Sequence, residues 1–287
     1  MENVQTESEC VLLHGSETDL RINLTHYKRS GDLLSSSIDS TGLLRWGGGM
    51  LLAQLLYSTG ILSEKLVVEL GCGSALLSCV ASMSGCSRLI ATDGFPKAVS
   101  LAEHNLRKNG CCSKSFDVCQ LRWGEASDES RVLQFLSPDP HFDVALASEV
   151  FYYHKGGSEE MVDQGTALFS TALRLLAVGG VLLIAYSPRY PGMARALREA
   201  GSRAGAFIRT INRGAFLTKE LAEVYCCNDT RLLMVAHSSE AIQHWVKKLG
   251  SPSQASRCDD SDFDNDPDWV EKEAREGWDA SSFSVYE

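Results

Sequence analysis

Residues 67–77 read Val67-Val68-Glu69-Leu70-Gly71-Cys72-Gly73-Ser74-Ala75-Leu76-Leu77, and this stretch decides the fold of the chain. The run before Gly71 predicts a buried strand, the paired glycines predict a tight turn, and the apolar residues that follow predict the start of a helix. In open α/β sheets, ligands bind at the carboxyl ends of the strands, next to a turn of this kind. The stretch therefore predicts a ligand-binding element, in which Glu69 presents a carboxylate to hydroxyl or ammonium groups.

Short β-rich runs and amphipathic stretches alternate on both sides of this element. The predicted strands are Lys65–Leu70, Arg88–Thr92, Phe116–Leu121, Phe142–Ala147, Val181–Tyr186, Ala206–Ile211 and Arg231–Ala236. The predicted helices are Gly47–Tyr57, one from Ala75, Pro96–Lys108, Glu159–Leu176, Gly192–Ala200 and Thr218–Val224. Alternation at this pace predicts the α/β class, with a doubly wound and mostly parallel sheet.

The composition divides the chain of 287 residues into three parts. Residues 1–40 are polar, and we expect an N-terminal extension with one or two short strands, Cys10–Leu13 and Leu20–Leu24, but little core. Residues 41–250 form the predicted α/β domain. Residues 251–287 form an acidic C-terminal tail, which we expect to be solvated; its aromatic residues leave a docked or partner-binding tail open.

The acidity of the chain is local. Residues 257–287 hold eleven acidic and three basic residues, and so contribute −8 of the net charge of −10. The nearly neutral remainder has no basic stripe, which argues against nucleic acid as a partner. No apolar run approaches the ~20 residues of a membrane helix, and the first residues do not resemble a signal peptide. We therefore expect a cytoplasmic protein, with the nucleus as an alternative.

Ten cysteines are present, and nowhere do two stand in the CxxC spacing of a zinc site or a redox motif. They are interpreted as reduced thiols, and no metal site is predicted.

Two residues indicate which ligand the glycine turn binds. Asp93 ends the next strand, where an acceptor for both ribose hydroxyls belongs, although it is also a plausible turn residue. Trp123 follows the third strand, either as a wall for an adenine ring or as a core tryptophan. Leu76 stands where a dinucleotide site has the last glycine of GxGxxG. Together these features favour S-adenosyl-L-methionine over a dinucleotide.

Four motifs in order carry a family resemblance. They are Thr41-Gly42-Leu43-Leu44-Arg45-Trp46, Glu69-Leu70-Gly71-Cys72-Gly73-Ser74-Ala75, Leu121-Arg122-Trp123-Gly124 and Ala147-Ser148-Glu149-Val150-Phe151-Tyr152. On these motifs, residues 41–237 resemble the class I, seven-strand, non-SET protein lysine methyltransferases of methyltransferase family 16. The resemblance implies a seven-stranded Rossmann-like sheet whose last strand is antiparallel, and S-adenosyl-L-methionine as cofactor.

The resemblance also implies roles for individual residues. Trp46 would close over the methionine part of the cofactor, Glu69 and the glycine turn would hold its amino-acid end, Asp93 would bind the ribose and Trp123 the adenine. The full set of implied cofactor-binding residues is Trp46, Glu69, Gly71, Gly73, Asp93, Trp123 and Ser148. Glu149 and Tyr152 fall on an acidic-x-x-Tyr motif that faces the acceptor, and they are the implied catalytic residues.

Three departures from the family pattern limit these assignments. Ala75 replaces a usual glycine, Glu149 stands where Asp is more frequent, and Tyr152-Tyr153-His154 is unusually aromatic. The main hypothesis is methylation of lysine in an intracellular protein, for which a basic or lysine-rich protein is a candidate. The alternatives are methylation of protein histidine, RNA or a small amine, and a non-catalytic module that binds S-adenosylmethionine. His154 is either a base or a loop residue, and Arg189 either faces substrate or is a surface charge.

Overall fold

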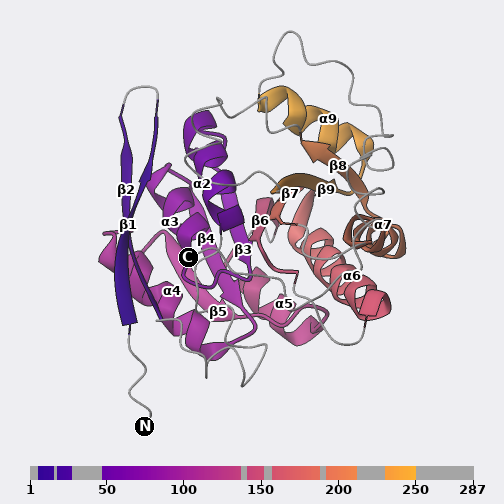
Figure 1. The fold of residues 1–287 in the computed structure, drawn as a ribbon, viewed down its shortest axis with the longest axis horizontal. Helices are drawn as coiled ribbons and strands as arrows, with labels where there is room; N and C mark the ends of the chain where they lie inside the picture. Colours follow the sequence, from indigo (N-terminus) through magenta and orange to yellow (C-terminus); the bar gives the residue numbers. More distant parts are fainter. Residues whose placement is uncertain are drawn as a thin grey trace, which may run out of the picture.

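The computed structural model describes residues 6–15, 18–27, 47–136, 141–151, 157–187, 192–211 and 230–249. Its centre is a seven-stranded sheet with the order β5-β4-β3-β6-β7-β9-β8 (Figure 1). The strands are β3 Leu66–Leu70, β4 Arg88–Asp93, β5 Phe116–Gln120, β6 Phe142–Ser148, β7 Leu176–Tyr186, β8 Phe207–Ile211 and β9 Arg231–Ala236. Neighbouring strands are parallel except at β9, which runs antiparallel to β7 and β8. The predicted doubly wound sheet with an antiparallel last strand is confirmed.

Seven helices are described around this sheet. They are α2 Gly47–Thr59, α3 Leu76–Met83, α4 Pro96–Lys108, α5 Ala126–Gln134, α6 Gly157–Leu175, α7 Met193–Ala204 and α9 Ser239–Lys248. Helices α5 and α9 were not predicted. Helix α5 buries Asp128 and Glu129 but only one apolar residue, Val132, so it lacks the apolar stripe by which a helix is recognised. The predicted helix Thr218–Val224 lies outside the described residues.

The strands alternate their side chains between two hydrophobic layers. Val67 and Val144 face the layer that contains α2, α3, α4 and α9. Their neighbours Val68 and Ala145 face the other layer, with α5, α6 and α7. Because the sheet is covered on both faces, its central strands are almost continuously apolar. In such a sheet, a site is expected at the carboxyl ends of the strands.

An N-terminal hairpin covers part of the first layer. Strands β1 (Thr6–Leu13) and β2 (Leu20–Tyr27) pair antiparallel, and Figure 1 shows them in indigo beside α3 and α4. Leu13, Ile22 and Leu24 are completely buried in the same cluster as α2 and α3. The prediction of little core in residues 1–40 is therefore wrong. Buried residues alternate with exposed ones in both strands, so the average composition concealed an apolar face.

The edge of β2 is tied to α4 by two asparagine side chains. Asn105 accepts a hydrogen bond from the Thr25 amide at 2.8 Å and donates to the Thr25 carbonyl at 2.9 Å. Asn109 makes the same pair of bonds with Asn23, at 2.8 and 2.9 Å. Two amide side chains thus satisfy backbone groups that a strand edge otherwise leaves unpaired.

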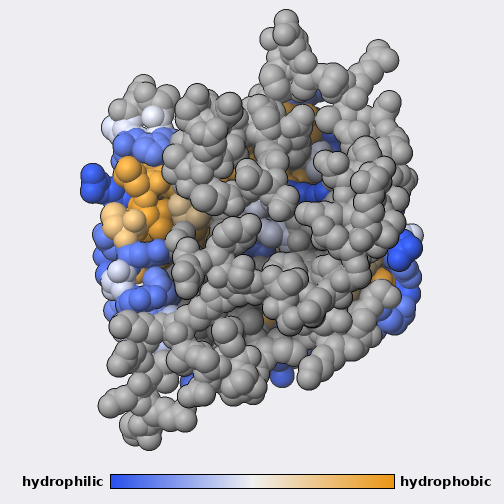
Figure 2. All heavy atoms as spheres, viewed as in Figure 1, coloured by the Kyte–Doolittle hydropathy of each residue, from blue (hydrophilic) through white to orange (hydrophobic). Residues whose placement is uncertain are grey.

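The surface shows polar and apolar areas side by side. In Figure 2, apolar residues show between hydrophilic ones on the side of the hairpin.

Among the described residues, none of the helices is both long and apolar enough to cross a bilayer. Within the same residues, no group of three or more His, Cys, Asp or Glu side chains is arranged to hold a metal ion.

Candidate active site

The predicted site residues meet where β3, β4 and β6 end. Glu69 on β3 pairs with Ala91 of β4 on one side and with Leu146 of β6 on the other, so the three strands end together. The turn after β3 is fixed to β4, because the amides of Gly71 and Cys72 both donate to the carbonyl of Thr92, at 2.9 and 2.8 Å. The ends of these strands therefore form one edge that carries the predicted glycine turn.

The glycine turn requires its glycines. Gly71 and Gly73 have positive φ angles of 80° and 49°. A Cβ atom on Gly71 would lie 2.8 Å from Val150 Cγ1 and 3.5 Å from Trp123 Cζ2. The turn, the residue after Glu149 and the predicted adenine wall are thus in contact. Such a close approach of backbone and side chains is what glycine permits.

Ala75 adopts the conformation that a glycine would adopt more easily. Its φ of 63° and ψ of 34° are left-handed, and its side chain is completely buried. The left-handed conformation costs an alanine roughly 1–2 kcal/mol. The turn therefore persists with Ala75, at the expense of local backbone strain.

Asp93 binds the glycine turn through one carboxylate oxygen and the residue before α4 through the other. Oδ2 accepts the Gly73 amide at 3.0 Å, and Oδ1 accepts the Phe95 amide at 2.9 Å. The side chain is 9% exposed. A carboxylate accepts about four hydrogen bonds, so this geometry is compatible with the ribose hydroxyls as further donors. Asp93 is therefore a turn residue, and its role in binding the ribose stays a prediction.

Glu69 is placed as a cap on α3. Its carboxylate accepts the Ser78 amide at 2.9 Å and also the Ser78 hydroxyl. Ala75, at the N-cap of this helix, has no side-chain oxygen to fill that role. Burial raises the pKa of Glu69 to about 8, although the bonds from Ser78 oppose that change. The carboxyl group therefore stabilises the helix start, and its assignment to the amino-acid end of the cofactor stays a prediction.

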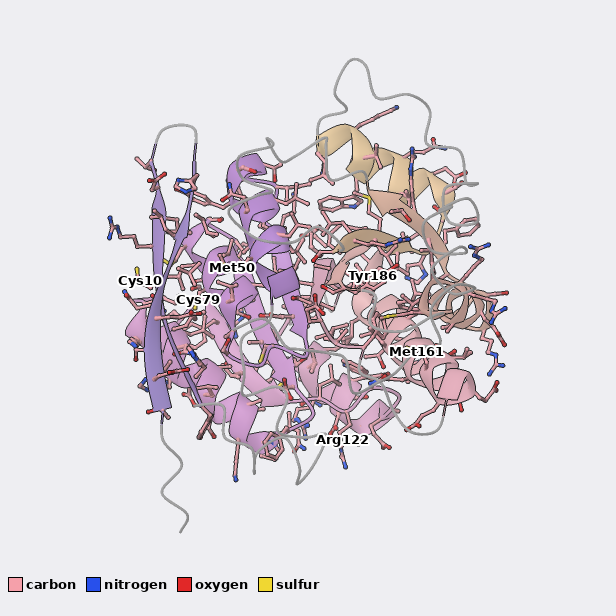
Figure 3. All side chains as sticks on the ribbon, viewed as in Figure 1. Cys10, Met50, Cys79, Arg122, Met161 and Tyr186 are labelled. Carbon is pink, nitrogen blue, oxygen red and sulfur yellow. The ribbon has the colours of Figure 1, made fainter. Side chains whose placement is uncertain are left out.

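Trp123 stands in a loop with several backbone bonds. The amide of Leu121 donates to the carbonyl of Asp93 at 3.0 Å, which ties the loop to the end of β4. Arg122 lies beside α5, as Figure 3 shows, and its amide donates to Asp128 at 3.1 Å. The Trp123 ring is half-buried against the second hydrophobic layer. The ring therefore packs against the core and also lies next to Gly71 of the glycine turn.

Glu149 follows β6 in a strained conformation. Its φ is 53°, and its side chain is 2% exposed. Ser187, at the end of β7, donates a hydrogen bond to Oε1 at 2.6 Å, and Thr230 Oγ1 lies 3.1 Å from the Ser187 hydroxyl. Left-handed backbone at a non-glycine residue is typical of functional sites, where the surrounding structure compensates its cost.

The first turn of α2 packs against the end of β6. A Cβ atom on Gly48 would lie 2.0 Å from Glu149 Oε1, and one on Gly49 would lie 3.1 Å from Ser148 Oγ. Ser148 thus faces the start of α2. Glu149 lies at a helix N-terminus, where a negative charge is favourable. Glycines at 48 and 49 let the helix approach this closely.

Some predicted site residues lie outside the described residues. These are Trp46, Tyr152, Tyr153, His154 and Arg189, together with the acidic tail. Among the described ones, the structure brings Glu69, Gly71, Gly73, Asp93, Trp123, Ser148 and Glu149 to the same edge of the sheet.

Sequence reasoning missed Ser187 and Gly48. The sequence contained one signal for each, because Ser187 directly follows a predicted strand and Gly48 is the centre of three glycines at the start of a predicted helix.

The comparisons with known proteins agree with this geometry. Residues 51–134 match the family model of the ribosomal protein L11 methyltransferase, PrmA. A protein of Streptococcus mutans assigned to the SAM-dependent methyltransferases has a similar fold, with a TM-score of 0.50 and 12% identity over 79% of this chain and 55% of that one. The SMU.776 protein, solved with S-adenosylhomocysteine, has a TM-score of 0.52 and 11% identity, over 79% of this chain and 56% of that one. The sheet order is that of the class I S-adenosylmethionine-dependent methyltransferase fold, and the family match lies in the same part of the chain.

Within this class, the chain is related to protein-lysine methyltransferases of family 16. It is 29% identical over 181 residues to the protein N-terminal and lysine N-methyltransferase EFM7 of Candida glabrata, which is 58% of this chain and 66% of that protein. It is 32% identical over 121 residues to the mouse protein-lysine methyltransferase METTL21E, which is 40% of this chain and 47% of that protein. The chain thus matches less than two thirds of the length of each relative.

Proposed function

We propose that this chain transfers the methyl group of S-adenosylmethionine to the side-chain amine of lysine in a protein. The observation that carries the proposal is the buried Glu149 carboxylate at the end of β6, one residue before the Val150 side chain that contacts the glycine turn. This placement sets a negative charge beside the predicted cofactor site, where an incoming ammonium group has to approach. The relation to EFM7 and METTL21E supports a protein amine as the acceptor.

The described residues fit the proposed cofactor. Gly71 and Gly73 supply the positive φ angles of the turn at the predicted amino-acid end, the Asp93 carboxylate suits two vicinal hydroxyls, and the half-buried Trp123 suits a flat ring without phosphates. A bound S-adenosylmethionine supplies a methyl group on a positively charged sulfur, which reacts by in-line displacement. The protein therefore has to orient the acceptor nitrogen and exclude water, more than it has to supply a reacting group.

Glu149 is suited to anchor the acceptor. A lysine has an unperturbed pKa of about 10.4, so it enters as an ammonium ion and has to lose a proton before it reacts. Glu149 can hold the ammonium by its charge, and Ser187 fixes the carboxylate by a 2.6 Å hydrogen bond. Desolvation lowers the pKa of the amine, whereas a carboxylate beside it favours the ammonium form, so the role proposed for Glu149 is to bind the acceptor and not to remove its proton. We extend the proposal to Tyr152 as an aromatic wall that stabilises the cationic product.

A labelling experiment tests the proposed reaction. The purified chain is incubated with a cell lysate and S-adenosylmethionine that carries a radioactive methyl group. The expected result is label in protein that acid hydrolysis releases as methyl-lysine. Methyl-histidine would overturn the choice of acceptor, and label confined to RNA or small molecules would remove the protein substrate. No transfer despite tight cofactor binding would favour the non-catalytic module.

The name of one relative favours a second acceptor of the same chemistry. EFM7 is named for both protein N-terminal and lysine methylation, and the α-amine is also a primary amine that binds as an ammonium ion. Mass spectrometry of the labelled proteins separates the two acceptors, because the modified peptide carries its methyl group either at its first residue or on a lysine. Methylated N-termini without methyl-lysine would replace the lysine proposal by this one.

Two substitutions separate the cofactor role from the acceptor role. Asp93→Asn is expected to weaken S-adenosylmethionine binding about 10- to 100-fold, the cost of losing charged hydrogen bonds. Glu149→Gln is expected to leave that Kd within about 2-fold but to lower kcat/KM for protein labelling about 10-fold or more. Glu103→Gln, on the exposed face of α4, is the matched control. If Glu149→Gln labelled protein as fast as the unchanged chain, the anchoring role would be wrong.

A further inference from the structure

Thr171 of α6 lies beneath the loop that carries Trp123. It is completely buried, and its hydroxyl oxygen accepts the amide of Gly124 at 2.9 Å. The same hydroxyl donates to Glu129 Oε1 of α5 at 2.7 Å. A threonine hydroxyl has a single proton, and because this proton goes to Glu129, the oxygen lone pairs are left for Gly124. The direction of each bond in the chain Gly124, Thr171, Glu129 is therefore fixed.

Glu129 is held as an anion. Arg174 binds both of its oxygens, with Nε to Oε2 at 2.6 Å and Nη2 to Oε1 at 2.5 Å. Burial alone raises the pKa of Glu129, but the bonds from Arg174 and Thr171 outweigh burial, so the net pKa is lowered. A bidentate arginine contact of this kind also fixes the orientation of the carboxylate. The carboxylate thus keeps the Thr171 hydroxyl in one orientation.

The loop is fastened on both sides of Trp123. Before it, the Arg122 amide donates to Asp128 of α5. After it, Gly124 has a φ of 85°, and its amide donates to Thr171. The ring between these two anchors approaches the glycine turn, with Cζ2 at 3.5 Å from the position of a Cβ on Gly71. A change in either anchor would therefore move the ring relative to the turn.

We propose that Thr171, supported by Glu129, is a positioning residue for the cofactor, because it holds Trp123 in the place where the adenine ring binds. This inference rests on the proposed cofactor site but not on the identity of the acceptor. Thr171 acts through Trp123 and does not itself touch the cofactor. It sets the affinity for any ligand that contains adenosine, and leaves the choice of protein substrate unchanged.

Calorimetry with S-adenosylhomocysteine and with 5′-methylthioadenosine, which lacks the amino-acid end, tests the proposal on the full chain. Thr171→Val preserves shape but removes the hydroxyl, and it is expected to weaken both ligands by about 5- to 10-fold, the effect of one hydrogen bond. Thr171→Ser keeps the hydroxyl and should bind both within about 2-fold of the unchanged chain. An equal loss of affinity for both ligands means that the substitution acts on the adenosine part, which the two ligands share.

A double-mutant cycle separates positioning from general destabilisation. In a Trp123→Ala background, Thr171→Val should weaken S-adenosylhomocysteine no further, because the ring through which it acts is gone. An equal loss in both backgrounds, or unchanged binding by a folded Thr171→Val chain, overturns the inference. If Thr171→Val does not fold, Asp128→Ala removes the other anchor and should weaken both ligands in the same way. Absence of binding by the unchanged chain would instead refute the proposed function.

Discussion

Glu69 carries a carboxyl group in the interior of the fold, where it is 3% exposed. The loss of hydration on burial penalises the ionised form and raises its pKa to about 8. Asp93, a second acid at the same edge of the sheet, acts in the same direction. The cap on α3 is therefore a group that changes its protonation within the physiological range of pH.

The raised pKa of Glu69 predicts a slope in stability. Between about pH 4.5 and 8, the folded chain holds a proton on Glu69 that the unfolded chain releases, so stability falls as the pH rises, by up to ~1.4 kcal/mol per pH unit. Glu69→Gln cannot ionise and should lose this contribution. Urea unfolding of both chains at pH 5, 6, 7 and 8 measures it, with Glu103→Gln as control. Parallel slopes for Glu69→Gln and the unchanged chain would show that Glu69 is ionised throughout.

Single residues differ in how far sequence locates them. Gly71 and Asp93 were found because each follows a predicted strand, and parallel strands end at one edge of a sheet; Glu149 was found through the motif of the family that the sequence resembles. Thr171 and Ser187 were not found, because their partners are 47 and 38 residues away in the chain. Such contacts exist only after α6 and β7 have packed. Local spacing thus predicts where a site lies, while tertiary contacts decide what holds it.

The prediction of helices from the sequence has a related limit. Helix α4, which has a clear apolar stripe, was predicted with its observed bounds. Helix α5 was missed because it packs through polar residues, with Asp128 bound by Arg122 and Arg131, and Glu129 by Arg174. The arginine contacts hold the pKa of Asp128 at about 2, so its charge persists at neutral pH. A helix that is held in place by ion pairs has little hydrophobic periodicity, so its sequence does not predict it.

The N-terminal hairpin is expected to stabilise the whole domain. Leu24 on β2 is completely buried against the first hydrophobic layer, so Leu24→Ala should cost about 2–4 kcal/mol of unfolding free energy. Thr6→Ala, at an exposed position of β1, should change it by less than about 0.5 kcal/mol. Urea unfolding followed by circular dichroism measures both. A cost for Leu24→Ala as small as for the control would mean that the hairpin is dispensable for the domain.

Most of the net charge of the molecule lies at the C-terminal end of its sequence. Residues 1–256 carry a net charge of only −2, since the last 31 residues hold −8. The described residues supply Glu149 and every predicted cofactor residue except Trp46, while the concentrated charge lies elsewhere in the sequence. A local negative field attracts basic partners over a distance set by the ionic strength. The proposed acceptor is a lysine, so the tail is a candidate for recruiting lysine-rich substrates.

Removal of residues 257–287 tests this recruitment. At ~10 mM salt, where charges act over about 30 Å, the shortened chain should label basic lysate proteins several-fold more slowly than the full chain. At ~150 mM salt, where the distance falls to about 8 Å, the two rates should converge. The Kd for S-adenosylmethionine should be equal in both chains. A full-length chain with asparagine in place of Asp259, Asp260, Asp262, Asp264, Asp266 and Asp268 keeps the length and the aromatic residues, so it should lose rate only if charge is the cause. If both altered chains label as fast as the unchanged one at low salt, the tail does not recruit substrate, and Glu149 is the main negative charge that the acceptor meets.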